Sequence, residues 1–275
     1  MNIGIHCEPQ VTETFWDTLW HEALKTPSPG PHESAWENAI DRRKMRFLTR
    51  YLPAEGAVSE VGCGSARLLA RVGLTAPALR LVALDESRVA LQVAKTTAAA
   101  FNVSLRTIRG TIASLPLADA SVDMVLSGGL LEHFPEPTPV LAEMVRVLRP
   151  GGVIYADVVP RKISWYRAHE AVRMRTSEYM EDGVYESSLG PADYRQRLGG
   201  LGCDVVRTCW CGVYPWLAQH RRRLGPLVAR ASEILDGTPI ARRWGWYFML
   251  VAIKRRTPRA ARSGQSVRES GPSRR

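Results

Sequence analysis

Residues 57–65 read AVSEVGCGS, an apolar stretch that runs into a Gly-x-Gly turn. Glycines in such a turn let backbone N–H groups approach a bound nucleotide closely. The fingerprint of a dinucleotide site needs a third glycine, and this chain has Arg67 at that position. Glu60, two residues before the first glycine, would repel a pyrophosphate but suits a ligand with ammonium or sulfonium charge. The turn therefore predicts a positively charged nucleoside ligand.

An acid follows at the end of the next apolar run, where residues 79–85 read LRLVALD. Asp85 is placed to accept hydrogen bonds from both hydroxyls of a ribose. A lone Asp at this position can also cap the helix that follows. The glycine turn, its acidic neighbour and a ribose acid together fit S-adenosylmethionine, which carries a ribose and positive charges but no phosphate.

Alternating strand and helix patterns between residues 46 and 158 must position these groups. Apolar runs and helical spacing predict strands at 57–61, 79–85, 103–110, 121–129 and 153–159, and helices at 65–73, 86–101 and 138–148. This order predicts an α/β fold with a Rossmann-like, doubly wound, mostly parallel sheet. Such sheets bind ligands at the carboxyl ends of their strands, so the chemistry is expected after Val61, Leu84, Ile108 and Leu126.

The remaining segments are expected to surround this core, which spans residues 46–158. We expect a helical N-terminal cap at 1–45, a lid insertion on the acceptor side at 159–190, and the rest of the sheet at 191–253, with a basic helix at 216–237 and an antiparallel final strand at 244–254. Residues 254–275 carry eight basic residues, one Glu and almost nothing apolar. Because such a segment cannot bury enough surface to fold, we predict a disordered basic tail.

Four stretches in order give the chain a specific resemblance: SEVGCGSARL, LVALDES, GTIASLPLADASVDMVLS and LEHFPEPTPVLAEMVRVLRPGGVIYADVV. They resemble the glycine-rich motif, the ribose strand, the adenine-contacting stretch and the Pro-Gly-Gly turn of class I S-adenosylmethionine-dependent methyltransferases. The branch that the chain resembles includes the ubiquinone and menaquinone biosynthesis enzymes. One motif alone would be a weak signal, but four in register are specific.

The resemblance implies a role for residues at matching positions. Glu60, Gly62 and Gly64 would cradle the methionine end of the cofactor. Asp85 would bind the ribose, with Glu86 beside the adenine. Where the family has an Asp for the adenine amino group, this chain has Gly110-Thr111-Ile112, so adenine recognition would depend on Thr111 and Ile112. The main chain of Ser127 and Gly128 would face the cofactor's amino group.

The stretch after the fourth strand, SGGLLEHF, bears on the acceptor. Enzymes that methylate nucleobase amino groups usually have an Asn- or Asp-Pro-Pro-aromatic stretch there, and its absence argues against a nucleic-acid substrate. His133 stands close to the expected transfer point and is the candidate catalytic residue, which orients or deprotonates the acceptor. Alternatively, Glu132 and His133 only cap and orient the following loop.

All eight tryptophans lie outside residues 37–164, in the segments that build the acceptor side of this family. They predict an aromatic lid over an apolar or planar acceptor. They could equally form the core of a small helical cap.

Composition limits the function classes further. The formal net charge is +10, but most of it lies in the tail, so the body gives little reason to expect a nucleic-acid partner. No apolar run is long enough to span a membrane, and the start of the chain lacks the pattern of a secretory signal, so a cytoplasmic location is expected. The five cysteines, two of them in the Cys-Trp-Cys at 209–211, predict neither a disulfide framework nor a metal site.

The sequence thus predicts an S-adenosylmethionine-dependent methyltransferase acting on a small molecule. O- or C-methylation of an aromatic, quinone-like, lipid or secondary-metabolite acceptor fits best. A protein or RNA methyltransferase is an alternative, and so is a non-catalytic regulatory protein that binds the cofactor. The acceptor, the methylated atom and the oligomeric state stay open, and a homodimer is compatible with the sequence.

Overall fold

The computed structural model describes residues 13–25, 35–168 and 184–256. Seven strands form one sheet in the order β3-β2-β1-β4-β5-β7-β6. They are β1 (Gly56–Val61), β2 (Leu79–Asp85), β3 (Arg106–Arg109), β4 (Val122–Gly128), β5 (Leu148–Val158), β6 (Cys203–Cys211) and β7 (Tyr247–Lys254). The tail from residue 257 and the middle of the expected lid, residues 169–183, lie outside the described residues.

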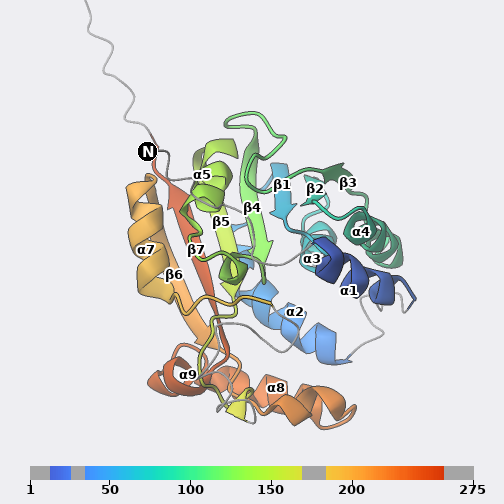
Figure 1. The fold of residues 1–275 in the computed structure, drawn as a ribbon, viewed down its shortest axis with the longest axis vertical. Coiled ribbons are helices and arrows are strands. Elements are labelled where there is room, and N and C mark those ends of the chain that lie inside the picture. Colours follow the sequence, from blue (N-terminus) through green and yellow to red (C-terminus); the bar gives the residue numbers. More distant parts are fainter. Residues whose placement is uncertain (1–12, 26–34, 169–183, 257–275) are drawn as a thin grey trace, which may run out of the picture.

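The first five strands pair in parallel, and β7 runs antiparallel to both of its neighbours, β5 and β6. The predicted α/β sheet, mostly parallel with an antiparallel final strand, is confirmed. β7 lies inside the sheet, because it fills the position between β5 and β6 (Figure 1). The strand order reverses between β1 and β4, which is where a doubly wound sheet leaves a crevice for a ligand.

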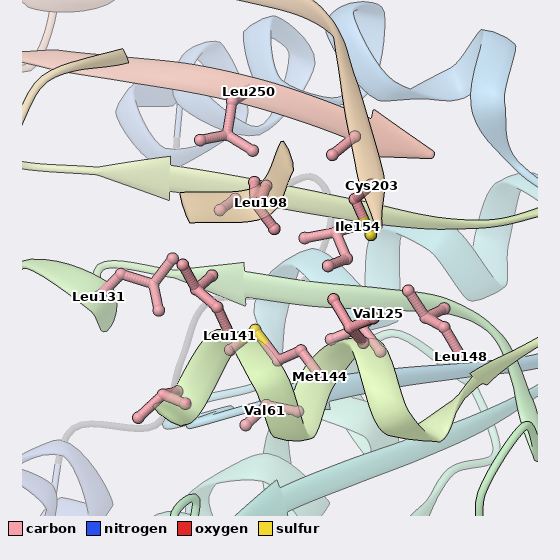
Figure 2. Packing of buried hydrophobic residues seen from close by; sticks show 14 of the residues in the cluster. Val61, Val125, Leu131, Leu141, Met144, Leu148, Ile154, Leu198, Cys203 and Leu250 are labelled. Atoms are coloured by element: carbon pink, nitrogen blue, oxygen red, sulfur yellow. The ribbon is translucent and has the colours of Figure 1, made fainter. Parts of the chain in front are cut away.

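Helices cover both faces of the sheet. They are α2 (Ala35–Leu48), α3 (Arg67–Thr75) and α4 (Arg88–Ala100) on one face, and α5 (Thr138–Val147) and α7 (Pro191–Gly200) on the other. On the second face, Leu141 and Met144 of α5 pack with Val125 and Ile154 of the sheet (Figure 2). The alternating side chains of β1, β2, β4, β5 and β7 fill both layers, as expected for strands buried on both sides.

The N-terminal helix α1 (Glu13–Lys25) lies beside α4 (Figure 1). None of its described side chains is fully buried, whereas α2 buries six residues, among them Phe47 and Leu48. The two expected N-terminal helices therefore differ in how closely they join the core.

The prediction of one basic helix at 216–237 is wrong. This stretch contains the short helices η4 (Trp216–His220), α8 (Gly225–Ala231) and η5 (Ser232–Leu235), and α9 (Pro239–Trp244) follows. Pro226 lies in the first turn of α8. A proline has no N–H to continue a preceding helix and is favoured where a new one begins, so the chain restarts there. These pieces lie together at one end of the molecule, at the bottom of Figure 1.

Candidate functional site

A cavity of about 1680 Å³ lies at the carboxyl ends of β1, β2 and β4. It brings together nine of the ten residues that the sequence singled out: Glu60, Gly62, Gly64, Asp85, Glu86, Thr111, Ile112, Gly128 and His133. Ser127 is not among the lining residues. It is fully buried in β4, and its hydroxyl has no hydrogen-bond partner.

The glycine turn needs its glycines for two reasons. Gly62 and Gly64 have φ of 63° and 48°, a region that other residues seldom adopt. A Cβ would also collide with neighbours, at 2.8 Å from Leu130 for Gly62 and 2.5 Å from Trp20 for Gly64. The turn therefore leaves bare backbone facing the cavity, beneath a tryptophan of α1.

Asp85 closes this turn. Its Oδ2 accepts a hydrogen bond from the Gly64 N–H at 2.9 Å, and its Oδ1 accepts one from the Ser87 N–H at 3.0 Å. The cap of α4 is Ser87, whose hydroxyl accepts a hydrogen bond from Ala90. Each carboxylate oxygen has more than one lone pair, so Asp85 keeps acceptor capacity for a hydroxyl donor. Burial raises the pKa of Asp85.

Glu60 lies in a buried cluster that the sequence did not reveal. The Lys44 ammonium on α2 pairs with Asp157 at the end of β5, with 2.8 Å between Nζ and Oδ1. Glu60 accepts a hydrogen bond from the Leu69 N–H at 3.3 Å. Burial raises the pKa of Glu60 to about 8, against the opposing charge of Lys44. Near neutral pH the cluster thus holds one ion pair and one protonated carboxyl group.

Nothing in the sequence marked Lys44, which lies well before the glycine turn. Burial lowers the pKa of Lys44, but the charge and hydrogen bond of Asp157, together with the charges of Asp41 and Glu60, raise that pKa by more, so it lies above its ordinary value. A lysine in an amphipathic helix is an ordinary surface residue, and only the packing of α2 against the strand ends buries this one. No sequence signal could have identified it.

The loop after β3 borders the opposite side of the cavity. Glu86 accepts a hydrogen bond from the Ile112 N–H at 3.2 Å, and the Thr111 hydroxyl accepts one from Ala113 at 3.3 Å. Arg109 donates to the main-chain oxygen of Glu86 at 2.8 Å. Glu86 therefore fixes the loop that the sequence assigned to the adenine, in addition to lining the cavity itself.

His133 belongs to the short helix η2 (Leu131–His133), directly after β4. Its Nδ1 lies 2.9 Å from the main-chain oxygen of Tyr185, and its ring meets the Trp16 ring edge-on at a centroid distance of 5.1 Å. A carbonyl only accepts, so Nδ1 carries the hydrogen and donates it. In the neutral ring Nε2 then keeps its lone pair, which is the arrangement that a general base requires.

The segment at 184–187 returns beside η2 and secures it. Ser187 donates its N–H to the main-chain oxygen of Glu132 at 2.7 Å, and the Glu132 side chain accepts a hydrogen bond from Val159 at 3.1 Å. Arg167 and Glu186 form a buried bidentate ion pair across the two ends of 169–183. Glu132 thus ties η2 to the segment at 184–187 and to the end of β5.

Aromatic side chains line the part of the cavity away from the glycine turn. Tyr166 stacks on Trp246 with 4.8 Å between ring centroids, and Trp36 meets Tyr214 edge-on at 5.4 Å. Four of the eight tryptophans line the cavity: Trp16, Trp20, Trp36 and Trp246. Trp210 instead packs against Phe248 of the sheet.

The described part of the chain offers neither a metal-binding cluster nor a membrane-spanning helix. There, no three His, Cys, Asp or Glu side chains come together in a way that could hold a metal ion. The Sγ atoms of Cys209 and Cys211 lie 3.6 Å apart, without a third such ligand. Among the described helices, none is both long and apolar enough to cross a bilayer.

Comparisons with known proteins agree with this geometry. Residues 59–156 match the family model described as "Methyltransferase domain". A Mycolicibacterium smegmatis protein named "Probable S-adenosylmethionine-dependent methyltransferase" is 38% identical over 207 residues, which cover 68% of this chain and 76% of that protein. A ubiquinone biosynthesis O-methyltransferase from Xylella fastidiosa is 26% identical over 68% of this chain and 76% of its own length.

Solved structures show how widely the fold is used. The crystal structure of the [4+2]-cyclase SpnF superposes with a TM-score of 0.62 at 20% identity, over 90% of this chain and 97% of that one. That protein is named as a cyclase, so likeness of fold does not by itself decide the reaction.

Proposed function

The chain belongs to the class I S-adenosylmethionine-dependent methyltransferases, and from this premise we propose that it methylates a small, apolar or planar acceptor. The observation that carries the proposal is a single cavity that joins a bare glycine turn, a histidine whose Nδ1 bonds to a main-chain carbonyl, and a wall of aromatic rings. Such a wall suits an acceptor recognised by shape and stacking.

The residues at the glycine end fit the family's cofactor. Gly62 and Gly64 have no room for side chains and offer bare backbone, and the Asp85 carboxylate lies beside them with unused lone pairs. Glu60 supplies a second carboxyl group on the same side. We assign the methionine end to Glu60, Gly62 and Gly64, the ribose to Asp85, and the adenine border to Glu86, Thr111 and Ile112. The main chain at Ser127 and Gly128 completes this assignment.

When bound, S-adenosylmethionine supplies an electrophilic methyl group on a sulfonium centre. The protein's own task is to position the acceptor, exclude water and remove a proton where the acceptor has one to lose. In the proposed mechanism His133 Nε2 receives that proton, while the Nδ1–H bond to Tyr185 fixes the tautomer and the direction of the ring. This role fits an acceptor hydroxyl or an acidic C–H.

The acceptor class follows from the aromatic wall and from one relative. Trp36, Tyr166, Tyr214 and Trp246 are suited to a planar ring or an apolar chain. The Xylella relative is named as a ubiquinone biosynthesis O-methyltransferase, which supports O-methylation as the reaction. O- or C-methylation of an aromatic, quinone-like, lipid or secondary-metabolite acceptor is therefore the proposed reaction.

Two measurements in sequence test the proposal. Calorimetry with S-adenosylmethionine and its demethylated product should show micromolar or tighter binding. A panel of phenols, hydroquinones, polyamines, an unstructured peptide and RNA is then assayed by mass spectrometry for added methyl groups. Transfer to phenols or hydroquinones alone supports the proposal, and transfer to peptide or RNA contradicts it. Cofactor binding with no transfer to any acceptor favours a non-catalytic regulator.

A further inference from the structure

Large apolar side chains are exposed on the short helices near the C-terminal end of the described chain. Of the twelve large apolar side chains that are exposed in the described residues, eight lie within residues 216–244. We call this face the basic–apolar surface, and its apolar members are Trp216, Leu217, Leu224, Leu227, Val228, Ile234, Ile240 and Trp244. Such a concentration marks an interaction site rather than scattered surface residues.

Helix α8 has its large apolar side chains on the solvent side, whereas an amphipathic helix usually turns them to the core. Its inward residues are small, namely Gly225 and Ala229, and a Cβ on Gly225 would lie 1.9 Å from the Ala218 carbonyl oxygen. Leu224 and Leu227 are each 63% exposed, and Val228 and Ala231 complete an outward stripe at helical spacing. Because α8 turns its large apolar residues to solvent and its small ones to the core, its outer face has no partner within the described part of the chain.

The charge on this surface has one sign. Residues 216–244 contain six arginines (221–223, 230, 242 and 243), all of them exposed, and only two acids. Both acids are paired with α2: Glu233 with Arg46 at 2.5 Å, and Asp236 with Arg43 at 2.9 Å. The acids therefore hold the segment to the core and do not neutralise its outer face.

We propose that the basic–apolar surface docks on the surface of a bilayer that contains anionic phospholipid. The aliphatic side chains would enter the boundary between headgroups and acyl chains, and the arginines would meet the phosphates. Trp244 lies under the Arg243 guanidinium at 4.4 Å and is bonded through its main-chain oxygen to Trp165, which is also exposed. Exposed indoles favour the headgroup level of a membrane.

Two other occupants fit the surface less well. A symmetric dimer through this face would bring two sets of six arginines together, which is unfavourable without acids to separate them. A nucleic acid would pair with the arginines, but it offers nothing to Leu224, Leu227 and Ile234, which is 82% exposed.

The surface adjoins the aromatic end of the cavity. Gln219 of η4 and Trp36 line the cavity, and Trp36 also packs behind Gly225 of α8. If the proposed function holds, docking would place the acceptor end next to the bilayer, where an apolar acceptor would be dissolved. This last step rests on the proposed function, whereas docking itself does not.

The test uses the full chain and vesicles of phosphatidylcholine alone or mixed in equal parts with phosphatidylglycerol. Cosedimentation should show binding to the mixed vesicles and much weaker binding to phosphatidylcholine. Changing the three arginines at 221–223 to Gln should weaken binding on the order of 100-fold. Leu224→Ser with Leu227→Ser should weaken it by a similar factor or more.

Matched controls come from other faces of the protein. Leu74 and Val206 are 46% and 48% exposed, and changing both to Ser should leave vesicle binding unchanged. The same holds when the exposed Arg50, Arg80 and Arg106 are changed to Gln. Unfolding midpoints should agree among all variants because every changed side chain is exposed. The basic residues beyond 256 are common to all of them.

Three results would overturn docking. The first is that either surface variant binds vesicles as the unchanged protein does, which would assign binding to another segment. The second is that the unchanged protein binds both vesicle types equally weakly. The third is that the unchanged protein binds no vesicles but associates with itself or with RNA, and that the change of Leu224 and Leu227 to Ser abolishes this association, which would identify a second copy or a nucleic acid as the occupant. None of these readouts needs a cofactor or an acceptor, so they are independent of the enzymatic assay.

Discussion

Glu60 lies between a buried ion pair and the glycine turn, and its protonation follows from that position. Its carboxyl group keeps its proton up to a pKa of about 8, because burial penalises the charged form. In the unfolded chain the same group ionises near 4.5. Its contribution to stability is therefore fully present below pH 4.5 and is lost as the pH rises through about 8.

Cofactor binding should reverse the preference of Glu60 for its protonated form. A sulfonium or ammonium group beside Glu60 favours the carboxylate, so we expect binding at pH 7 to release up to about 0.9 proton. Affinity should accordingly rise between pH 6 and 8, by up to about tenfold per pH unit. Calorimetry in buffers of different ionisation enthalpy measures the released proton directly.

The Glu60→Gln variant is the matched control for the proton release on cofactor binding. The variant keeps the shape and the hydrogen bond from Leu69, but it cannot release a proton. Its cofactor affinity should be weaker above pH 8 and nearly independent of pH. Proton release that persists in Glu60→Gln would show that another group, such as Asp85, titrates on binding.

His133 gives the second prediction at this scale. His133→Ala should lower kcat by about 10² to 10⁴-fold with an acceptor that loses a proton, because the base at Nε2 is removed. Cofactor affinity should stay within a few fold, since the glycine turn and Asp85 are untouched. Single-turnover assays and calorimetry separate the two quantities. Turnover close to that of the unchanged protein would leave His133 only the role of orienting the loop.

Among the elements, the two N-terminal helices should respond differently to truncation. Removal of residues 1–34 deletes α1 but keeps α2, whose buried residues belong to the core. The unfolding midpoint should fall by less than about 4 °C, because α1 has no fully buried described side chain. Cofactor affinity should fall about tenfold or more, because Trp16 and Trp20 leave the cavity.

A longer truncation provides the contrast. Removal of residues 1–40 cuts into α2 and deletes Asn38 and Ala39, which are buried, so we expect loss of the folded state. Circular dichroism and thermal unfolding distinguish the two outcomes. If removal of residues 1–34 alone unfolds the protein, α1 is part of the core.

The elements of residues 46–158 were predictable because their apolar periods and glycine turns are local signals. The strands at 57–61 and 79–85 and the helix at 138–148 lie within a residue or two of the observed bounds. The wrong prediction of a single helix at 216–237 has a local cause as well. Basic and apolar residues there suggested one helix, although Gly225-Pro226 already marked the restart of the chain.

The site was predictable where a motif covered it and not elsewhere. Glu60 and Asp85 lie next to recognisable patterns, and the structure places both in the cavity. Lys44 reaches the cavity only because α2 packs over the strand ends. The partner of His133 is the Tyr185 main-chain oxygen, and no side-chain pattern can reveal a backbone acceptor.

At the scale of the whole molecule, α2 joins the sheet to the C-terminal helices through Arg43. This side chain is buried, pairs with Asp236, and donates to the Ser232 hydroxyl at 2.8 Å. Arg43→Met should cost about 3–5 kcal/mol of unfolding free energy, because it leaves the carboxyl group without its cation. Burial already raises the pKa of Asp236 to about 6. Denaturant titration at pH 8 measures the loss.

Arg46 supplies the control on the same helix. Its ion pair with Glu233 joins the same two segments, but the Arg46 side chain is 67% exposed. Arg46→Met should therefore cost less than about 1 kcal/mol. Equal losses for the two variants would refute burial as the reason that Arg43 matters.

The position of β7 has a consequence for how the chain is made. The ribosome releases β6 well before β7, yet among the described strands β6 pairs with β7 alone. Until Tyr247–Lys254 emerges, β6 is an unpaired edge with apolar side chains, and chaperones or neighbouring nascent chains can bind such an edge. A stop codon just before residue 247 would remove β7, leave β6 without a strand partner and deprive β5 of one of its two partners. Folding of this sheet is therefore completed late in synthesis, after every element of the cofactor half is already in place.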